Sequence, residues 1–178
     1  MAIEAEADAV LRTVPEWIWD GTSLPVPIED IADSCFGLLV RDVADLTVAP
    51  GAPALPPGQS LSGLLLPSLG EIWVNEWEGQ QWPGRRRFTI GHELGHWIMH
   101  APTSQGIFCR SGTVQPEDDV AVVPPIEEEA QIFSAALLMP THLIDVLHGE
   151  QPDVNALCAD FGVTRKAMAR RLAELDLI

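Results

Sequence analysis

A short motif near the middle of the chain, His92-Glu93-Leu94-Gly95-His96, constrains the possible folds more than any other feature. Histidines four residues apart project from one face of an α-helix about one turn apart, so both rings can reach a single metal ion. The glutamate that follows the first histidine lies off that axis, where its carboxylate can reach water beside the metal. Apolar residues at helical spacing surround the motif, which predicts a metal-binding helix over about residues 85–101.

A third ligand is expected further along the chain, because a catalytic zinc site commonly has three protein ligands and one open position. The strongest candidate segment is a second predicted helix, Ile126–Met139, which begins with Glu127, Glu128 and Glu129. Ala130 belongs to the apolar stripe of that helix and follows Glu127 by three residues, which places Glu127 on the inward face. Glu128 points about 100° away. We therefore expect Glu127 to be the third ligand.

Other polar residues near the motif remain alternatives or neighbours. Cys109 is a possible third ligand, although cysteine-rich ligand sets usually mark closed structural sites. His100 continues the motif face but stands about 6 Å further along the helix axis, so we expect it beside the ligands or at the helix end. Gln131 lies one turn after Glu127 and is expected to hold a ligand histidine through its free ring nitrogen.

Charge and composition exclude several classes of protein. The net charge of −16 comes from 26 acidic residues against 10 basic ones, a balance that repels nucleic-acid backbones and anionic membranes. The acidic N-terminus does not resemble a signal peptide, and no apolar run has the length of a membrane span. The 3 cysteines form no C-x-x-C pair, and this pattern indicates a protein of a reducing compartment. We expect a cytoplasmic protein that does not bind a membrane.

The pattern of helices and strands predicts an α+β fold. Its predicted parts are a small, mainly antiparallel β-sheet packed on the motif helix and on the Glu127 helix, and a helical C-terminal segment that resembles a helix-turn-helix. Three strands are expected, at Leu38–Val43, Leu61–Leu66 and Glu71–Trp77, with a loop over residues 102–124. The strand Glu71–Trp77 either pairs with an extended substrate or is simply part of the sheet.

Two blocks of sequence resemble the ImmA/IrrE family of metallopeptidases. They are R-R-R-F-T-I-G-H-E-L-G-H and E-E-E-A-Q-I-F-S-A-A-L-L-M-P, with further likeness in V-P-I-E-D-I-A and in the final F-G-V-T-R-K-A-M-A-R-R-L-A-E-L. The resemblance implies a thermolysin-like zinc peptidase with His92, His96 and Glu127 as ligands and Glu93 as the general base. It also implies one Zn²⁺ per chain, although Mn²⁺ tolerates the same ligands. Gln131 departs from the asparagine or aspartate that the family usually has.

The same resemblance implies a domain division and a substrate. Residues 1–140 would form the zinc metallopeptidase domain, and residues 141–178 a helical appendage. Family members cleave, or promote cleavage of, a helix-turn-helix repressor and so release genes of stress responses, phages or mobile elements. We therefore expect a protein substrate of that kind.

An alternative is a regulator that binds DNA or a repressor and in which the metal is structural. Its basis is the C-terminal helix pair, which contains four of the basic residues: Arg165, Lys166, Arg170 and Arg171. An equal number of acidic residues brings that segment to zero net charge, which argues against direct DNA binding. Glu93 separates the two hypotheses, because a structural site has no use for an acid–base group there.

Overall fold

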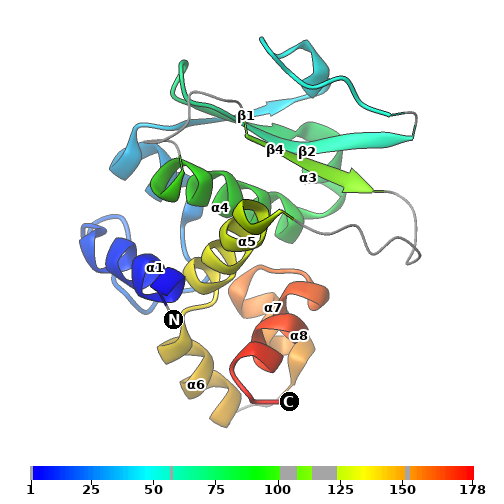
Figure 1. Ribbon diagram of the computed structural model, residues 1–178. Coiled ribbons are helices and arrows are strands. Elements are labelled where there is room, and N and C mark those ends of the chain that lie inside the picture. The colour runs from blue at the N-terminus through cyan, green and yellow to red at the C-terminus, as the bar shows by residue number, and fades with distance from the viewer. Residues whose placement is uncertain (1, 57, 101–107, 114–123, 151–152) are drawn as a thin grey trace.

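The computed structural model describes residues 2–56, 58–100, 108–113, 124–150 and 153–178, and these residues form helices and one β-sheet (Figure 1). The helices are α1 (Ala2–Thr13), α2 (Ile28–Asp30) with a π turn (Ile31–Cys35), α3 (Glu76–Gln81), α4 (Pro83–Met99), α5 (Pro125–Leu138), α6 (Thr141–Glu150), α7 (Val154–Phe161) and α8 (Arg165–Glu174). The strands are β1 (Leu39–Val43), β2 (Gln59–Leu66), β3 (Glu71–Asn75) and β4 (Phe108–Thr113), and a 3₁₀ turn spans Leu46–Val48. The expected α+β class with a mainly antiparallel sheet is confirmed.

The sheet has the strand order β1-β3-β2-β4. β1 runs parallel to β3, whereas β2 is antiparallel to both β3 and β4. β3 therefore lies inside the sheet with a partner on each side, and the edges are β1 and β4. Of the two interpretations of the strand Glu71–Trp77, pairing within the sheet is the one that the structure shows, because the backbone groups of β3 bond to two neighbouring strands.

β4 lies where the sequence predicts only loop. Its backbone pairs with β2 from Gln59 opposite Thr113 to Leu65 opposite Phe108, with an irregularity between Leu61 and Gly63. A strand of this kind is poorly marked in sequence, because strand formation depends more on the neighbouring strand than on local preference. The sheet consequently has four strands, one more than expected.

Side-chain caps and special backbone positions set several helix ends. The Asn75 side chain accepts a hydrogen bond from the backbone N–H of Glu78, at 3.0 Å, and so begins α3. Thr164 begins α8 by accepting from the backbone N–H of Ala167, at 3.3 Å. Gly162, with φ of 61°, ends α7 in the left-handed conformation. The end of α7 and the start of α8 produce the helix–turn–helix shape of the C-terminal segment.

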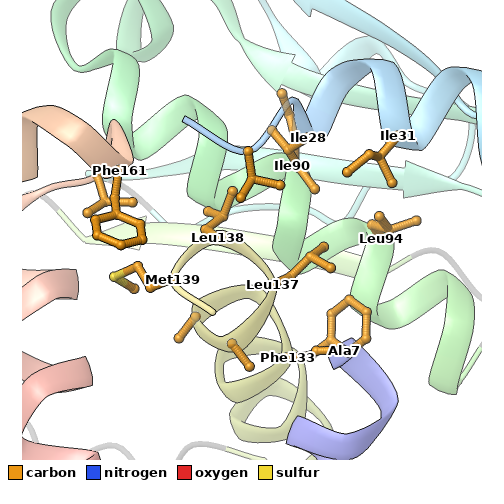
Figure 2. Close-up of a cluster of buried hydrophobic side chains, with 14 of the residues drawn as sticks. Ala7, Ile28, Ile31, Ile90, Leu94, Phe133, Leu137, Leu138, Met139 and Phe161 are labelled. Atoms are coloured by element: carbon orange, nitrogen blue, oxygen red, sulfur yellow. The ribbon is translucent and has the colours of Figure 1, made fainter. Parts of the chain in front are cut away.

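α4 lies between the sheet and α5, and it packs on β2 and β3 with one side and on α5 with the other. Figure 2 shows this core, in which α4 places Ile90 and Leu94 beside the apolar face of α5. That face consists of Phe133, Leu137 and Leu138, all with no exposed surface. α4 therefore forms the main contact between the helices and the sheet. A separate small cluster, Leu46, Ala49, Leu61, Leu64 and Leu66, packs around β2 and the 3₁₀ turn.

The C-terminal segment shares the main core. Leu157 and Phe161 of α7 and Met168 and Leu172 of α8 are buried in the same cluster as the side chains of α4 and α5. The Arg171 side chain is 1% exposed. The division of the chain at residue 140 stays a prediction.

Within the described residues, no single helix combines the length and apolar composition of a membrane span. α5 and Thr141–Gly149 meet those criteria only together, as a pair bent by 55°.

Candidate metal centre

The motif helix α4 presents its two histidines on one buried face. His92 is 1% exposed and His96 is 0% exposed, and their ring centroids are 4.6 Å apart with the planes almost perpendicular. The two Nε2 atoms are 3.1 Å apart. One helical turn thus places two imidazole nitrogens around the same point, as the four-residue spacing predicts.

Glu127 on α5 brings a carboxylate to that point. Its Oε2 lies 3.1 Å from Nε2 of His92, and its Oε1 lies 3.2 Å from Nε2 of His96. The neighbouring Glu128 is exposed, as helical phase predicts, and the carboxylate of Glu129 lies 3.7 Å from Nε2 of His100. Of the three glutamates that begin α5, Glu127 is therefore the one that joins the histidine pair.

Close packing between α4 and α5 allows this approach. A Cβ atom added at Gly91 would lie 2.6 Å from Oγ of Ser134, and one added at Gly95 would lie 3.0 Å from Cδ1 of Phe133. Larger side chains at these two glycines would force the helices apart. Oγ of Ser134 also donates a hydrogen bond to the backbone carbonyl of Phe88, at 2.9 Å, which holds the two helices together.

His92, His96 and Glu127 fit a divalent metal ion. One ligand atom from each lies within 4.8 Å of the others, and the closest separations are 3.1 to 3.2 Å. Ligand atoms 2.0–2.1 Å from a tetrahedral zinc ion are about 3.3 Å apart, so the observed spacing matches that geometry closely. Two imidazoles with one carboxylate also form a donor set that leaves a fourth position open.

The carboxylate of Glu127 is in the form that a ligand needs. Burial raises its pKa, but hydrogen bonds from His92 and His96 outweigh burial and lower the pKa to about 2. The group is therefore ionised at neutral pH, and its negative charge is available to a cation between the two rings.

Glu93 lies on the side of α4 that faces β2. Its side chain is completely buried, and a Cβ atom added at Gly63 of β2 would lie 3.2 Å from its Oε1. The same added atom would overlap Cγ2 of Thr89, one turn earlier on α4. Only a glycine at this place in β2 leaves room for the helix and for the Glu93 carboxylate. Gly63 was not among the predicted site residues; an isolated glycine inside a strand is the signal that could have marked it, because such a glycine often allows a close approach of another group.

His100 stands at the end of α4, as one of the sequence interpretations predicts. It is the C-cap residue, and its ring centroid is 5.4 Å from that of His96. Burial and the neighbouring His96 lower its pKa, while Glu129 acts in the opposite direction. His100 therefore neighbours the three candidate ligands, beside His96 and Glu129.

Two other sequence expectations have different outcomes. The structure gives Gln131 a partner other than the predicted ligand histidine, because its Oε1 accepts a hydrogen bond from Arg170 of α8, at 2.9 Å. The glutamine side chain, which is longer than the asparagine or aspartate usual in the family, reaches outward to α8. The side chain of Cys109 lies outside the described part of the chain, so its candidacy as a ligand stays untested.

Comparisons with known proteins identify a matching family and a solved structure of similar fold. The model of the family described as Peptidase_M78, IrrE N-terminal-like domain, matches residues 67–173. No curated protein matches the chain. A solved structure described as a Mycobacterium tuberculosis transcriptional regulator is similar in fold, with a TM-score of 0.60 and 15% identity. The alignment covers 97% of this chain and 47% of that one, so this chain spans about half the length of that protein.

Proposed function

Because the matched model spans more than half of the chain, the protein belongs to the Peptidase_M78 (IrrE N-terminal-like) family, and we propose that it is a zinc-dependent metalloendopeptidase. This membership confirms the resemblance to ImmA/IrrE proteins and supports a peptidase. The observation that carries the proposal is the convergence of His92, His96 and Glu127 within 4.8 Å, with Glu93 one residue after the first histidine.

Each residue of the centre has a distinct chemical task in this proposal. His92, His96 and Glu127 hold the metal, and a zinc ion bound there supplies a Lewis acid that lowers the pKa of water and polarises a carbonyl. Glu93 accepts a proton from the attacking water and then gives it to the nitrogen of the leaving amine. Its burial strengthens these interactions, because the surrounding protein screens charge less than water does.

The edge of the sheet nearest to Glu93 offers a place for the peptide backbone. Gly63 of β2 contacts Glu93, and β4 is the next strand after β2 and forms the edge. An extended peptide that pairs with β4 would therefore run close to the centre. β4 replaces β3 as the strand proposed for this contact.

The proposed substrate is a helix-turn-helix repressor whose cleavage releases stress-response, phage or mobile-element genes. The charge of −16 on this chain supports a basic partner such as a DNA-binding protein, because opposite charges accelerate encounter and disfavour acidic competitors.

The contacts of the C-terminal segment argue against a DNA-binding regulator. Arg165 bonds to Asn155, at 3.1 Å, and Arg170 bonds to Glu174 and Gln131. The guanidinium of Arg171 is buried and bonds to other parts of the protein. Three of the four basic residues thus use their donors within the fold, and few remain for phosphates.

The test combines metal analysis with peptide cleavage. Peptides made from a bacterial lysate with a glutamate-specific protease serve as substrates, and mass spectrometry identifies new ends after incubation with the zinc-loaded protein. We expect Glu93→Gln to retain one zinc per chain and to cleave at least about 100-fold more slowly, the usual effect of losing an acid–base group. Unchanged cleavage by this variant would refute the mechanism.

Two further variants test the ligand assignment. Glu127→Ala is expected to lose zinc, whereas Glu128→Ala should retain it because Glu128 is exposed and points away from the histidines. Zinc retained at full occupancy in the Glu127 variant would show that another residue is the third ligand.

A further inference from the structure

Two tryptophans stand exposed beside the start of the motif helix. Trp77 of α3 is 60% exposed, and Trp82, which directly precedes α4, is 46% exposed. Their ring centroids are 5.3 Å apart and their planes meet at 89°, so each ring holds the other in place. We call these two residues the aromatic pair. Large aromatic side chains fixed at a surface are typical of sites that bind another polypeptide.

A chain of contacts joins the aromatic pair to Glu93. The guanidinium of Arg85 lies 6.0 Å from the centroid of the Trp82 ring and donates a hydrogen bond to Oγ of Ser62, at 2.9 Å. Ser62 precedes Gly63, the residue of β2 that packs against Glu93. These contacts link the exposed start of α4, where the aromatic pair lies, to the buried part of that helix that holds the catalytic carboxylate.

Helix geometry gives the distance between the aromatic pair and the candidate metal centre. Ten residues separate Trp82 from His92, and a rise of 1.5 Å per residue makes this about 15 Å along the helix. An extended peptide advances about 3.3 Å per residue. A substrate that pairs with β4 and continues toward the first residues of α4 would therefore reach the aromatic pair about four or five residues from the scissile bond.

The charge around the aromatic pair favours a basic side chain. The charged groups that surround α3 are four carboxylates, Glu29, Asp42, Glu76 and Glu78, and two guanidiniums, Arg85 and Arg86. Both guanidiniums already bond to carboxylates of this group. The excess of negative charge attracts a cation, and the face of a tryptophan ring binds one, as Trp82 does with Arg85.

We propose that the aromatic pair is a specificity site that binds an arginine or lysine of the substrate four or five residues from the scissile bond. This inference rests on the proposed peptidase function and adds to it a chemical preference at a defined distance. A basic polypeptide segment is the occupant that the tryptophans and the surrounding carboxylates fit together.

The experiment compares cleavage preferences of three proteins on the lysate-derived peptides described above. The wild type is expected to cleave peptides enriched in arginine or lysine at the fourth or fifth position from the cut. The double variant W77A/W82A should lose that enrichment while its zinc content stays at one per chain. Trp17→Ala is the matched control, because Trp17 is 79% exposed but lies outside α3 and α4.

A kinetic measurement on one cleaved peptide makes the result quantitative. Replacing its basic residue by alanine should lower kcat/KM about five-fold for the wild type and for Trp17→Ala, mainly through KM, and leave W77A/W82A unaffected. Cleavage without a basic preference, or a preference that survives in W77A/W82A, overturns this inference and leaves the peptidase function intact. No cleavage by the zinc-loaded wild type overturns the proposed function itself.

Discussion

Gly63 is the residue where a single methyl group should disturb the candidate site most directly. Its backbone pairs with β3 on one side and β4 on the other, so the strand cannot move away from α4. A Cβ atom there would overlap Cγ2 of Thr89 and lie 3.2 Å from Oε1 of Glu93. Thr89 is 1% exposed, so its methyl group lies inside the protein. We expect Gly63→Ala to destabilise the fold through overpacking.

The size of this effect follows from the contact. Overpacking of a close-packed interior by one methyl group costs about 1–3 kcal/mol. Thr89→Ser removes the methyl group that the new Cβ would meet, and by itself costs roughly 0.8 kcal/mol of buried surface. The double variant G63A/T89S should therefore be about as stable as T89S alone, which gives a coupling of about 1–3 kcal/mol between the two sites.

Urea unfolding of the metal-free protein measures these differences. With a slope of about 2 kcal/mol/M, Gly63→Ala should lower the midpoint by about 0.5–1.5 M, whereas the double variant should have the midpoint of T89S alone, about 0.4 M below the wild type. Gly149→Ala is the control, because no atom lies within 4 Å of its added Cβ and it stands in α6, where alanine gains about 0.5–1 kcal/mol over glycine. An unchanged midpoint for Gly63→Ala, or no recovery in the double variant, would refute the close contact between β2 and α4.

Two further predictions concern stability and charge. Arg171→Ala should lower the unfolding free energy by about 3 kcal/mol and Tm by roughly 9 °C, because it removes a buried guanidinium that bonds to Glu4, Thr141 and the carbonyl of Met139. Thermal unfolding measures the change, and Arg165→Ala is the control: Arg165 is exposed, so its loss should change the unfolding free energy by less than about 0.5 kcal/mol. The second concerns Glu127, whose pKa falls from 4.5 to about 2 on folding, so its ionised form stabilises the metal-free protein above pH 4.5 and loses that effect as pH falls toward 2. This pKa difference corresponds to a stabilisation on the order of 3 kcal/mol. The urea midpoint of the wild type should therefore approach that of Glu127→Gln as pH falls from 5 to 2. A constant separation between the two midpoints over this pH range would contradict the prediction.

The residues of the candidate centre were largely predictable because their arrangement is local. His92, Glu93 and His96 lie within one helical turn and a half, so the period of the helix alone orients them. Helical phase also distinguished Glu127 from Glu128, since the burial of α5 follows the same period. Resemblance to a family added the expected chemistry, but the geometry of each ligand face could be derived from the sequence pattern.

Contacts between distant segments were not predictable in this way. The position of β3 inside the sheet, the pairing of β4 with β2 and the bond from Arg170 to Gln131 each join residues far apart in sequence. The period of a strand or helix shows which way a side chain points and says nothing about which segment it meets. For this reason the sequence left open whether Glu71–Trp77 pairs with a substrate or within the sheet, and the observed partner of Gln131 differs from the expected one.

The sequence by itself determined the two helices of the candidate centre, the fold class and the donor groups, because helical and strand periods are properties of neighbouring residues. Only the tertiary structure decided that the Glu127 carboxylate lies 3.1 Å from the ring of His92, 35 residues away. That distance depends on α4 and α5 packing at Gly91 and Gly95, where the absence of side chains lets the helices approach. A metal centre made from two helices is therefore predictable in its residues, whereas its geometry is set by the packing between the helices.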